Sequence, residues 1–165
     1  MMQDAYAGAL PHVDALARGC ADRDPQALFR AIDAYAAQAL GHRLCTINRY
    51  DPGPMAVVRL YSSNPQAYPP GGSKRKAGTE WGRQVLLEQR LFIGQGSEAI
   101  RQAFDDHAAI AALGLRSVIN VPVVARGVCL GTANFLMTAD VVTPEQVAAA
   151  RLAGLLAVPG LLAAG

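Results

Sequence analysis

The sequence of 165 residues predicts one α+β domain, an α/β sandwich in which two β-hairpins build a sheet flanked by helices. Residues 44–50 with 55–62, and residues 118–124 with 128–137, are runs rich in β-branched residues around short turns, which is typical of antiparallel hairpins. Apolar residues recur every three or four positions before the first hairpin and after the second, as on amphipathic helices. Helices of this kind pack their apolar sides on the sheet.

Two helices are predicted before the first hairpin. Residues 4–18 form the first, and Pro11 breaks or kinks it because proline lacks the N–H that a helix interior needs. The second begins after Asp24, a good N-cap, with Pro25 in the first helical position. Gly41 ends it, since glycine readily adopts the left-handed conformation of a C-terminal cap.

The middle of the chain, after the first hairpin, is predicted to be partly irregular. Residues 64–79 contain prolines, glycines and the basic triplet Lys74-Arg75-Lys76 without periodicity, so we expect a long loop, and such loops in compact domains are often functional. A helix over 79–89 and a short strand over 91–94 follow. We then expect a helix from Ser97 with a continuation over 108–113, which Asp105-Asp106 caps and Gly114 stops.

The last helix has a clear start signal. Thr143 is an N-cap, Gln146 follows three residues later, and Pro144 occupies the first helical position, which together form a capping-box pattern. The helix is predicted to run to about Val158, where Pro159-Gly160 ends or kinks it.

Charge and cysteine content exclude several classes of protein. The net charge is +2, and the basic excess lies largely in Lys74-Arg75-Lys76, so we expect no nucleic-acid partner, which would need a wider basic stripe. The three cysteines, Cys20, Cys45 and Cys129, are odd in number and far apart. This spacing argues against a disulfide framework or a zinc ribbon.

The sequence also predicts a protein without membrane contact. The N-terminus lacks the basic and apolar regions of a cleavable signal. The longest apolar stretch begins at Val147 and is interrupted by Arg151, Gly154 and Pro159, so we expect it to fall short of the ~20 residues that span a bilayer. We therefore expect a cytoplasmic protein.

Two motifs near the C-terminus, and a weaker one upstream, resemble the GAF domain family. The first motif is carried by Gly114, Ser117, Val121, Pro122, Gly127 and Gly131. The second is Thr143-Pro144-Glu145-Gln146, which resembles the family's entry to its last helix. The upstream motif is Glu88-Gln89-Arg90-Leu91, where Gln89 stands in place of the usual glycine and Leu91 in place of the usual proline. The resemblance implies that residues 1–165 form one small stand-alone domain of the bacterial type, with a core over about residues 26–162.

The resemblance implies a profilin-like sheet of about six antiparallel strands, with the terminal helices on one face and a ligand pocket under loops and short helices on the other. It also implies a homodimer through the N- and C-terminal helices. The last helix supports this, because Arg151 is its only charge after Glu145 and a helix that is apolar all round needs cover on more than one side. The alternative is a monomer in which residues 4–18 supply that cover.

We expect the pocket to bind an unidentified small molecule, since pockets combine apolar walls with a few placed polar groups. The candidate aromatic walls, for which plain core packing is the alternative, are Tyr61, Tyr68, Trp81, Phe92 and Phe104. The candidate polar groups are Arg59, Asp105, His107, Ser117, Asn120 and Asn134. A positive lid over an anionic ligand would come from Lys74, Arg75 and Arg83.

Asn120 and Asn134 are of special interest because each lies in an otherwise apolar strand, where an unpaired buried amide costs ~1–3 kcal/mol. A three-residue loop at Arg126-Gly127 would place the two amides opposite each other on one face. A two-residue loop would offset them by one and send them to opposite faces. Hydrogen bonding to a neighbouring loop backbone is the alternative to a ligand role.

Residues for catalysis or metal binding are not evident, so we expect a binding domain rather than an enzyme. Asp105, Asp106 and His107 are adjacent in sequence and do not share a helix face as ligands of one metal usually do. The run Phe104 to His107 only weakly echoes the motif of cyclic-nucleotide-binding members, and no bilin-attachment setting is present. We expect no metal and no identifiable cofactor.

Two alternatives remain at this point. One is a thiol-dependent reductase of free methionine sulfoxide, which would need two nearby cysteines, whereas Cys45 and Cys129 lie in predicted strands and not in a glycine-rich loop. The other is a scaffold that only dimerises through its terminal helices.

Overall fold

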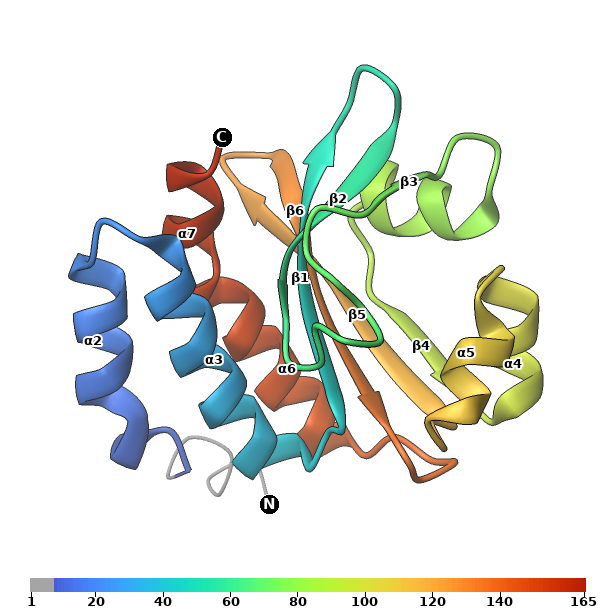
Figure 1. Ribbon diagram of the computed structural model, residues 1–165, viewed down its shortest axis with the longest axis horizontal. Coiled ribbons are helices and arrows are strands. Elements are labelled where there is room, and N and C mark those ends of the chain that lie inside the picture. The colour runs from blue at the N-terminus through green and yellow to red at the C-terminus, as the bar shows by residue number, and fades with distance from the viewer. Residues whose placement is uncertain (1–7) are drawn as a thin grey trace.

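The computed structural model describes residues 8–165, which form a six-stranded antiparallel sheet with helices on both faces (Figure 1). The strands are β1 (Leu44–Asp51), β2 (Ala56–Ser62), β3 (Ser73–Arg75), β4 (Phe92–Gln95), β5 (Ser117–Ala125) and β6 (Val128–Met137). Their spatial order is β3-β2-β1-β6-β5-β4, and each neighbouring pair is antiparallel. The predicted α+β class and six-stranded antiparallel sheet are confirmed.

The terminal helices cover one face of the sheet, which we call the helical face (Figure 1). They are η1 (Leu10–His12), α2 (Val13–Ala21), α3 (Pro25–Leu40), α6 (Pro144–Leu156) and α7 (Val158–Ala163). α3 and α6 contribute most helical residues of the main hydrophobic core, whereas α2 adds Leu16 and packs against α3. α6 packs against α3 and the sheet and makes at most marginal contact with α2, so the described residues 8–18 do not supply the cover that the monomer alternative supposed. Residues 4–7 of that first predicted helix lie outside the described residues.

Side-chain and glycine caps fix the ends of α3 and the start of α6 as predicted, whereas the predicted cap at Asp105-Asp106 is wrong, since Asp106 makes no side-chain capping hydrogen bond to the helix that follows it. Asp24 accepts a hydrogen bond from the Gln26 backbone N–H at 3.0 Å, and Gly41 ends α3 with a φ of 68°. Thr143 and Gln146 form the full capping box of α6. The first turn of α7 contains Pro159, so the chain bends after α6 instead of ending there.

The stretch 144–163 is longer than the sequence predicted, because α6 and α7 follow each other with almost no interruption. By length and composition these 20 residues could cross a bilayer, the only such stretch that the described part of the chain contains. Ala149, Ala153 and Leu161 are buried in the main core. A core helix of a soluble domain has the same composition, and the packing of α6 on α3 and β5 is of that kind.

Shorter elements cover the opposite side of the sheet, which we call the loop face. They are η2 (Gly82–Leu87), a π-helical segment, with α4 (Ser97–Ala103) and α5 (His107–Ala112). The predicted loop over 64–79 contains strand β3, which pairs with β2, so this part of the prediction was wrong. The helix predicted over 79–89 is also shorter than expected. Gln89, which stands in place of the usual glycine, has a φ of 55°. It therefore adopts the left-handed conformation that glycine adopts most readily.

Two β-bulges decide which side chains face which side of the sheet. The turn between β5 and β6 has two residues, Arg126 and Gly127, but Leu130 is an extra residue without a partner on β5. The bulge restores the register of a three-residue loop, so Asn120 and Asn134 lie directly opposite each other. A second bulge at Leu60 shifts the pairing of β2 with β1 in the same way.

Gly131 is required by the close approach of β6 to β1. A Cβ there would lie 2.0 Å from the backbone oxygen of Asn48, so Gly131→Ala should lower the free energy of unfolding by about 1–3 kcal/mol through overpacking. Urea denaturation measures the change. Gly53→Ala is the matched control, because the nearest atom to its new Cβ, on Asp51, is 3.5 Å away. Equal stability of the two variants would contradict the crowding argument.

Candidate functional site

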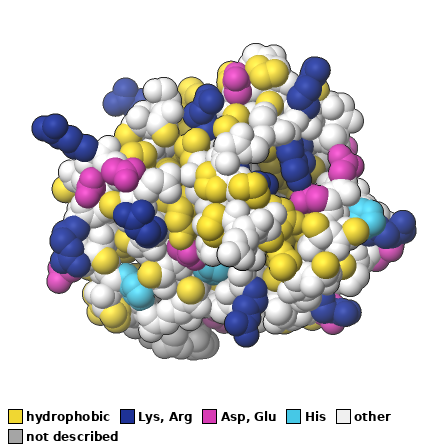
Figure 2. All heavy atoms as spheres, in the orientation of Figure 1, with side chains coloured by type: hydrophobic (Ala, Val, Ile, Leu, Met, Phe, Trp, Pro, Cys, Tyr) yellow, Lys and Arg dark blue, Asp and Glu magenta, His cyan; other side chains and the backbone are white. Residues whose placement is uncertain are grey.

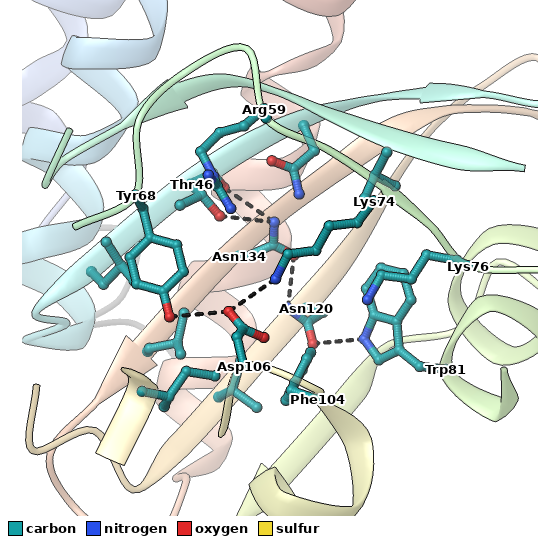
Figure 3. Close-up of a pocket in the computed structure, with 17 residues that line it drawn as sticks. Thr46, Arg59, Tyr68, Lys74, Lys76, Trp81, Phe104, Asp106, Asn120 and Asn134 are labelled. Atoms are coloured by element: carbon teal, nitrogen blue, oxygen red, sulfur yellow. Dashed lines mark hydrogen bonds and ion pairs between the residues drawn. The ribbon is translucent and has the colours of Figure 1, made fainter. Parts of the chain in front are cut away.

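A cavity of about 70 Å³ lies on the loop face, between the sheet and the segments that cover it (Figure 3). Leu44, Val118 and Leu136 form the apolar end of its floor. Polar residues of β1, β5 and β6 continue the floor, and side chains of β2, β3 and the helical segments form the walls. The loop before β3 is held over the cavity by Arg59, whose backbone N–H donates to Gly72 and whose Nη1 donates to Pro69.

A row of polar side chains crosses the floor of the cavity. Thr46, Asn134 and Asn120 occupy opposed positions on β1, β6 and β5. The Trp81 indole N–H donates to Asn120 Oδ1 at 2.9 Å, and Asn120 Nδ2 donates to Asn134 Oδ1 at 2.7 Å. Asn134 Nδ2 in turn donates to the hydroxyls of Thr46 and Thr132, both at 3.1 Å.

This polar row is buried, since Trp81, Asn120 and Asn134 are each 3–6% exposed. Such groups are tolerated in a core only when they are hydrogen-bonded, and each amide here has both a donor and an acceptor partner. The amides bond to each other and to the indole, not to a loop backbone as the alternative interpretation supposed. Their contact with a ligand remains a prediction.

An ion pair and a hydroxyl close one wall. The Asp106 carboxylate accepts a hydrogen bond from the Tyr68 hydroxyl at 3.1 Å and lies 2.9 Å from Lys74 Nζ (Figure 3). Burial alone would raise the pKa of Asp106, but the hydrogen bond and positive charge of Lys74 hold it below its usual value. Burial and Asp106 raise the pKa of Tyr68, so its hydroxyl stays protonated and donates.

Two cations lie over aromatic rings of the cavity. The Arg59 guanidinium lies 5.0 Å from the centre of the Tyr68 ring, and Lys76 Nζ lies 4.9 Å from that of Trp81. Burial and the nearby charge of Lys74 lower the pKa of Lys76. Figure 2 shows basic side chains beside acidic ones on the molecular surface around β3 and α5.

Two buried polar atoms of the cavity residues lack a hydrogen-bond partner: Oδ1 of Asn48 and Nε of Arg59. The two residues are directly paired across β1 and β2, so their side chains share the loop face. In the part of the chain that the structure describes, the other two such atoms are Ser117 Oγ and His42 Nδ1.

The structure brings together six of the predicted wall and polar residues, and of the predicted lid Lys74 also lines the cavity, whereas Arg75 and Arg83 do not. The six wall and polar residues that line the cavity are Arg59, Tyr68, Trp81, Phe104, Asn120 and Asn134. Phe92 instead packs edge-on against Phe104, with ring centres 6.0 Å apart, and belongs to the apolar clusters behind the wall.

Four predicted site residues lie elsewhere. The bulge at Leu60 sends Tyr61 to the helical face, where its hydroxyl donates to Asp33 of α3. Ser117 faces the same side, because it alternates with Val118, whose side chain lines the cavity. Asp105 borders a separate surface hollow with the basic triplet, and His107 begins α5 outside the cavity.

Sequence reasoning missed several residues of the cavity, notably Thr46, Asn48 and Asp106. Thr46 and Asn48 alternate with the apolar Cys45 and Ile47, and this period of two could have indicated a polar face on β1. Nothing in the sequence distinguishes Asp106 from its neighbour Asp105, because only the short segment between α4 and α5 orients them.

A second cluster of polar groups lies under α3 on the helical face. Asp33 Oδ1 is 2.6 Å from His42 Nε2, and potential metal-ligand atoms of Asp33, His42 and Cys45 lie within 4.8 Å of one another. These three could hold a cation. The hydrogen bonds from Tyr61 and His42 already engage both carboxylate oxygens of Asp33.

The buried cysteines are not arranged as a redox pair. Cys45 lies in the core of the helical face, whereas Cys129 belongs to the cluster of Trp81 on the loop face. Cys45 pairs with Phe135 on β6, roughly 20 Å along that strand from Cys129 at ~3.3 Å per residue. Disulfides need Cα atoms within ~7 Å. Burial raises the pKa of both thiols, and Cys20 is exposed on α2.

Asn120 and Asn134 should be coupled energetically. Each of Asn120→Ala and Asn134→Ala leaves a buried partner unsatisfied and should cost about 1–3 kcal/mol of unfolding free energy. The double variant should cost about 1 kcal/mol less than the sum, as a double-mutant cycle in urea measures. Asn120→Ala combined with the distant Gly53→Ala should be additive. Additive costs for the asparagine pair would contradict the network.

No protein-family model and no curated protein matches the sequence. Several solved structures match the fold. The chromophore-binding domain of a Stigmatella aurantiaca bacteriophytochrome has a TM-score of 0.71 and 14% identity, over 99% of this chain and 61% of that one. The present chain thus spans about three fifths of that domain.

Two matches cover most of both chains. The GAF domain of an Acinetobacter phosphoenolpyruvate-protein phosphotransferase has a TM-score of 0.68 and 13% identity, over 91% of this chain and 92% of that one. The GAF domain of a Bacillus halodurans sensor histidine kinase has a TM-score of 0.65 and 11% identity, over 79% and 89%. The order of the strands, the terminal helices on one face and these matches agree: the chain folds as a GAF domain.

Proposed function

We propose that the chain is a GAF-type sensory domain that binds a small molecule in the cavity of the loop face and does so without catalysis. The observation that carries the proposal is the cavity, over which aromatic and charged side chains converge from β2, β3 and the segments around η2 and α5. Apolar walls with a few placed polar groups are typical of ligand sites. We expect the protein to act in the cytoplasm.

Similar folds in signalling proteins support the sensory role. The matched structures include domains of a sensor histidine kinase and of a methyl-accepting chemotaxis protein. In this chain, Asn120 on the cavity floor is followed directly by Val121, whose side chain packs against Gly154 of α6. This contact offers a short route by which an occupied cavity could influence the terminal helices.

We infer that the terminal helices form a homodimer interface. Large apolar side chains are exposed on these helices, namely Leu10, Val13, Leu155 and Leu162, with exposed fractions between 49% and 72%. Exposed apolar patches on a domain are typical of association surfaces. In such a dimer the terminal helices of both copies would lie against each other, so ligand binding in either cavity could affect the same interface.

Binding is tested with Trp81, the only tryptophan of the chain, whose indole N–H lies in the cavity floor. A screen of organic acids, amino acids, nucleosides and neutral heterocycles should find compounds that shift the indole N–H signal in NMR spectra and raise the melting temperature. Signals of the turn between β1 and β2, residues 52–55, which does not line the cavity, should stay unchanged. If no class of compound shifts the indole signal, the domain is not a sensor of this kind.

The dimer is tested by sedimentation. The wild type should be dimeric, Leu155→Arg should be monomeric because it places a charge in the interface, and the stability of the wild type should rise with protein concentration. Val128→Arg is the matched control, since Val128 is 59% exposed at the β5–β6 turn, outside these helices. A wild type that is monomeric at every concentration would refute the interface.

A further inference from the structure

We propose that the cavity binds a small organic acid with a hydrogen-bond donor next to its acidic group, such as an α-hydroxy or α-amino acid. The acid group would accept from Arg59, and the neighbouring donor would bond to Asn48. This inference rests on the proposed function, because it names the ligand class of the same cavity.

The two unpartnered atoms require opposite hydrogen-bonding groups on a ligand. Nε of Arg59 is a donor, so it needs an acceptor, whereas Oδ1 of Asn48 is an acceptor and needs a donor. The residues are opposed on β1 and β2, where opposed Cβ atoms are ~4.5–5.5 Å apart. One small molecule with an acceptor and a donor on adjacent carbons can therefore satisfy both, and leaving either unpaired is costly.

The charge balance of the cavity favours an anion. Three cations line it, Arg59, Lys74 and Lys76, against the single carboxylate of Asp106. The Asp106 carboxylate is itself an acid group at the cavity wall, and it is held by a hydrogen bond from the Tyr68 hydroxyl and an ion pair with Lys74. Lys76 is partly desolvated beside Lys74, and an added negative charge would stabilise its protonated form.

The size of the cavity favours a ligand of a few heavy atoms. The cavity has a volume of about 70 Å³. Pockets for drug-sized ligands have ~300–1,000 Å³. Glycolate, which joins one carboxylate to one hydroxyl, is thus the simplest probe.

The first experiment compares ligands on the wild-type protein, with the Trp81 indole signal as the readout at constant ionic strength. Glycolate should bind at least about tenfold more tightly than acetate, which lacks the hydroxyl, and than glycolamide, which lacks the charge. Equal affinity for acetate would mean that the ligand hydroxyl does not bond to Asn48, whose partner would then be a bridging water. Equal affinity for glycolamide would mean that the cavity does not require a negatively charged ligand. Inorganic phosphate binding as tightly as glycolate would reveal a general anion site. Each of these results overturns the proposal.

Two substitutions should act in opposite directions. Arg59→Gln should weaken glycolate binding roughly 10- to 100-fold, because a charge-assisted hydrogen bond is lost. Asp106→Asn should tighten it several-fold, because a competing negative charge is removed while a Tyr68 partner is kept. Arg75→Gln is the control, because Arg75 lies next to Lys74 on β3 but does not line the cavity. This substitution should change the affinity for glycolate little. Weaker glycolate binding in Asp106→Asn would show that the Asp106 carboxylate supports the site and does not compete with the bound acid, and it would overturn the charge argument.

The outcomes separate the two proposals. If neutral heterocycles shift the Trp81 signal and organic acids do not, the ligand class is wrong and the sensory function stands. If neither acids nor neutral compounds shift the signal, both proposals fail together.

Discussion

The register between β5 and β6 is the constraint on which the cavity depends. The bulge at Leu130 offsets the strands by one residue, which sets Asn120 opposite Asn134. Without that offset one amide would turn to the apolar core of the helical face, where an unpaired polar group costs ~1–3 kcal/mol. The indole of Trp81 would also lose its acceptor. One extra residue thus fixes both the floor of the cavity and the position of one of its walls.

The two faces of the sheet are built from different chemistry. On the helical face, Ala149, Ala150 and Ala153 let α6 lie close to the strands, and Gly154 lies against Val121 with no room for a side chain. Close packing of this kind leaves no space for a ligand. On the loop face, polar residues alternate into the floor and the cover consists of short segments. The cavity forms where the sheet is polar and its cover is irregular.

Long side chains hold the irregular cover in place. Arg59 binds the loop before β3 through its backbone and its guanidinium, and Lys74 reaches from β3 to Asp106 at the start of α5. These contacts join segments that have few apolar residues of their own. Because they are mostly charged or aromatic groups at the cavity wall, the interactions that close the site are also those that a ligand would meet.

The sequence by itself determined the elements whose causes are local. The caps at Asp24 and Thr143 and the glycine at Gly41 set helix ends through backbone hydrogen bonding and conformation within a few residues. The hairpins followed from composition and turns, and the polar residues inside apolar strands pointed to Asn120 and Asn134. These features need no knowledge of distant contacts.

Only the tertiary structure decided which side chains share the cavity. The bulge at Leu60 moved Tyr61 to the helical face, and strand β3 formed in an aperiodic segment because the edge of β2 was there to pair with it. Asp106 faces the cavity and Asp105 does not, although the sequence treats them alike. A bulge changes the face of every later residue while hardly changing composition, and the partners of an ion pair are brought together by the folding of remote segments.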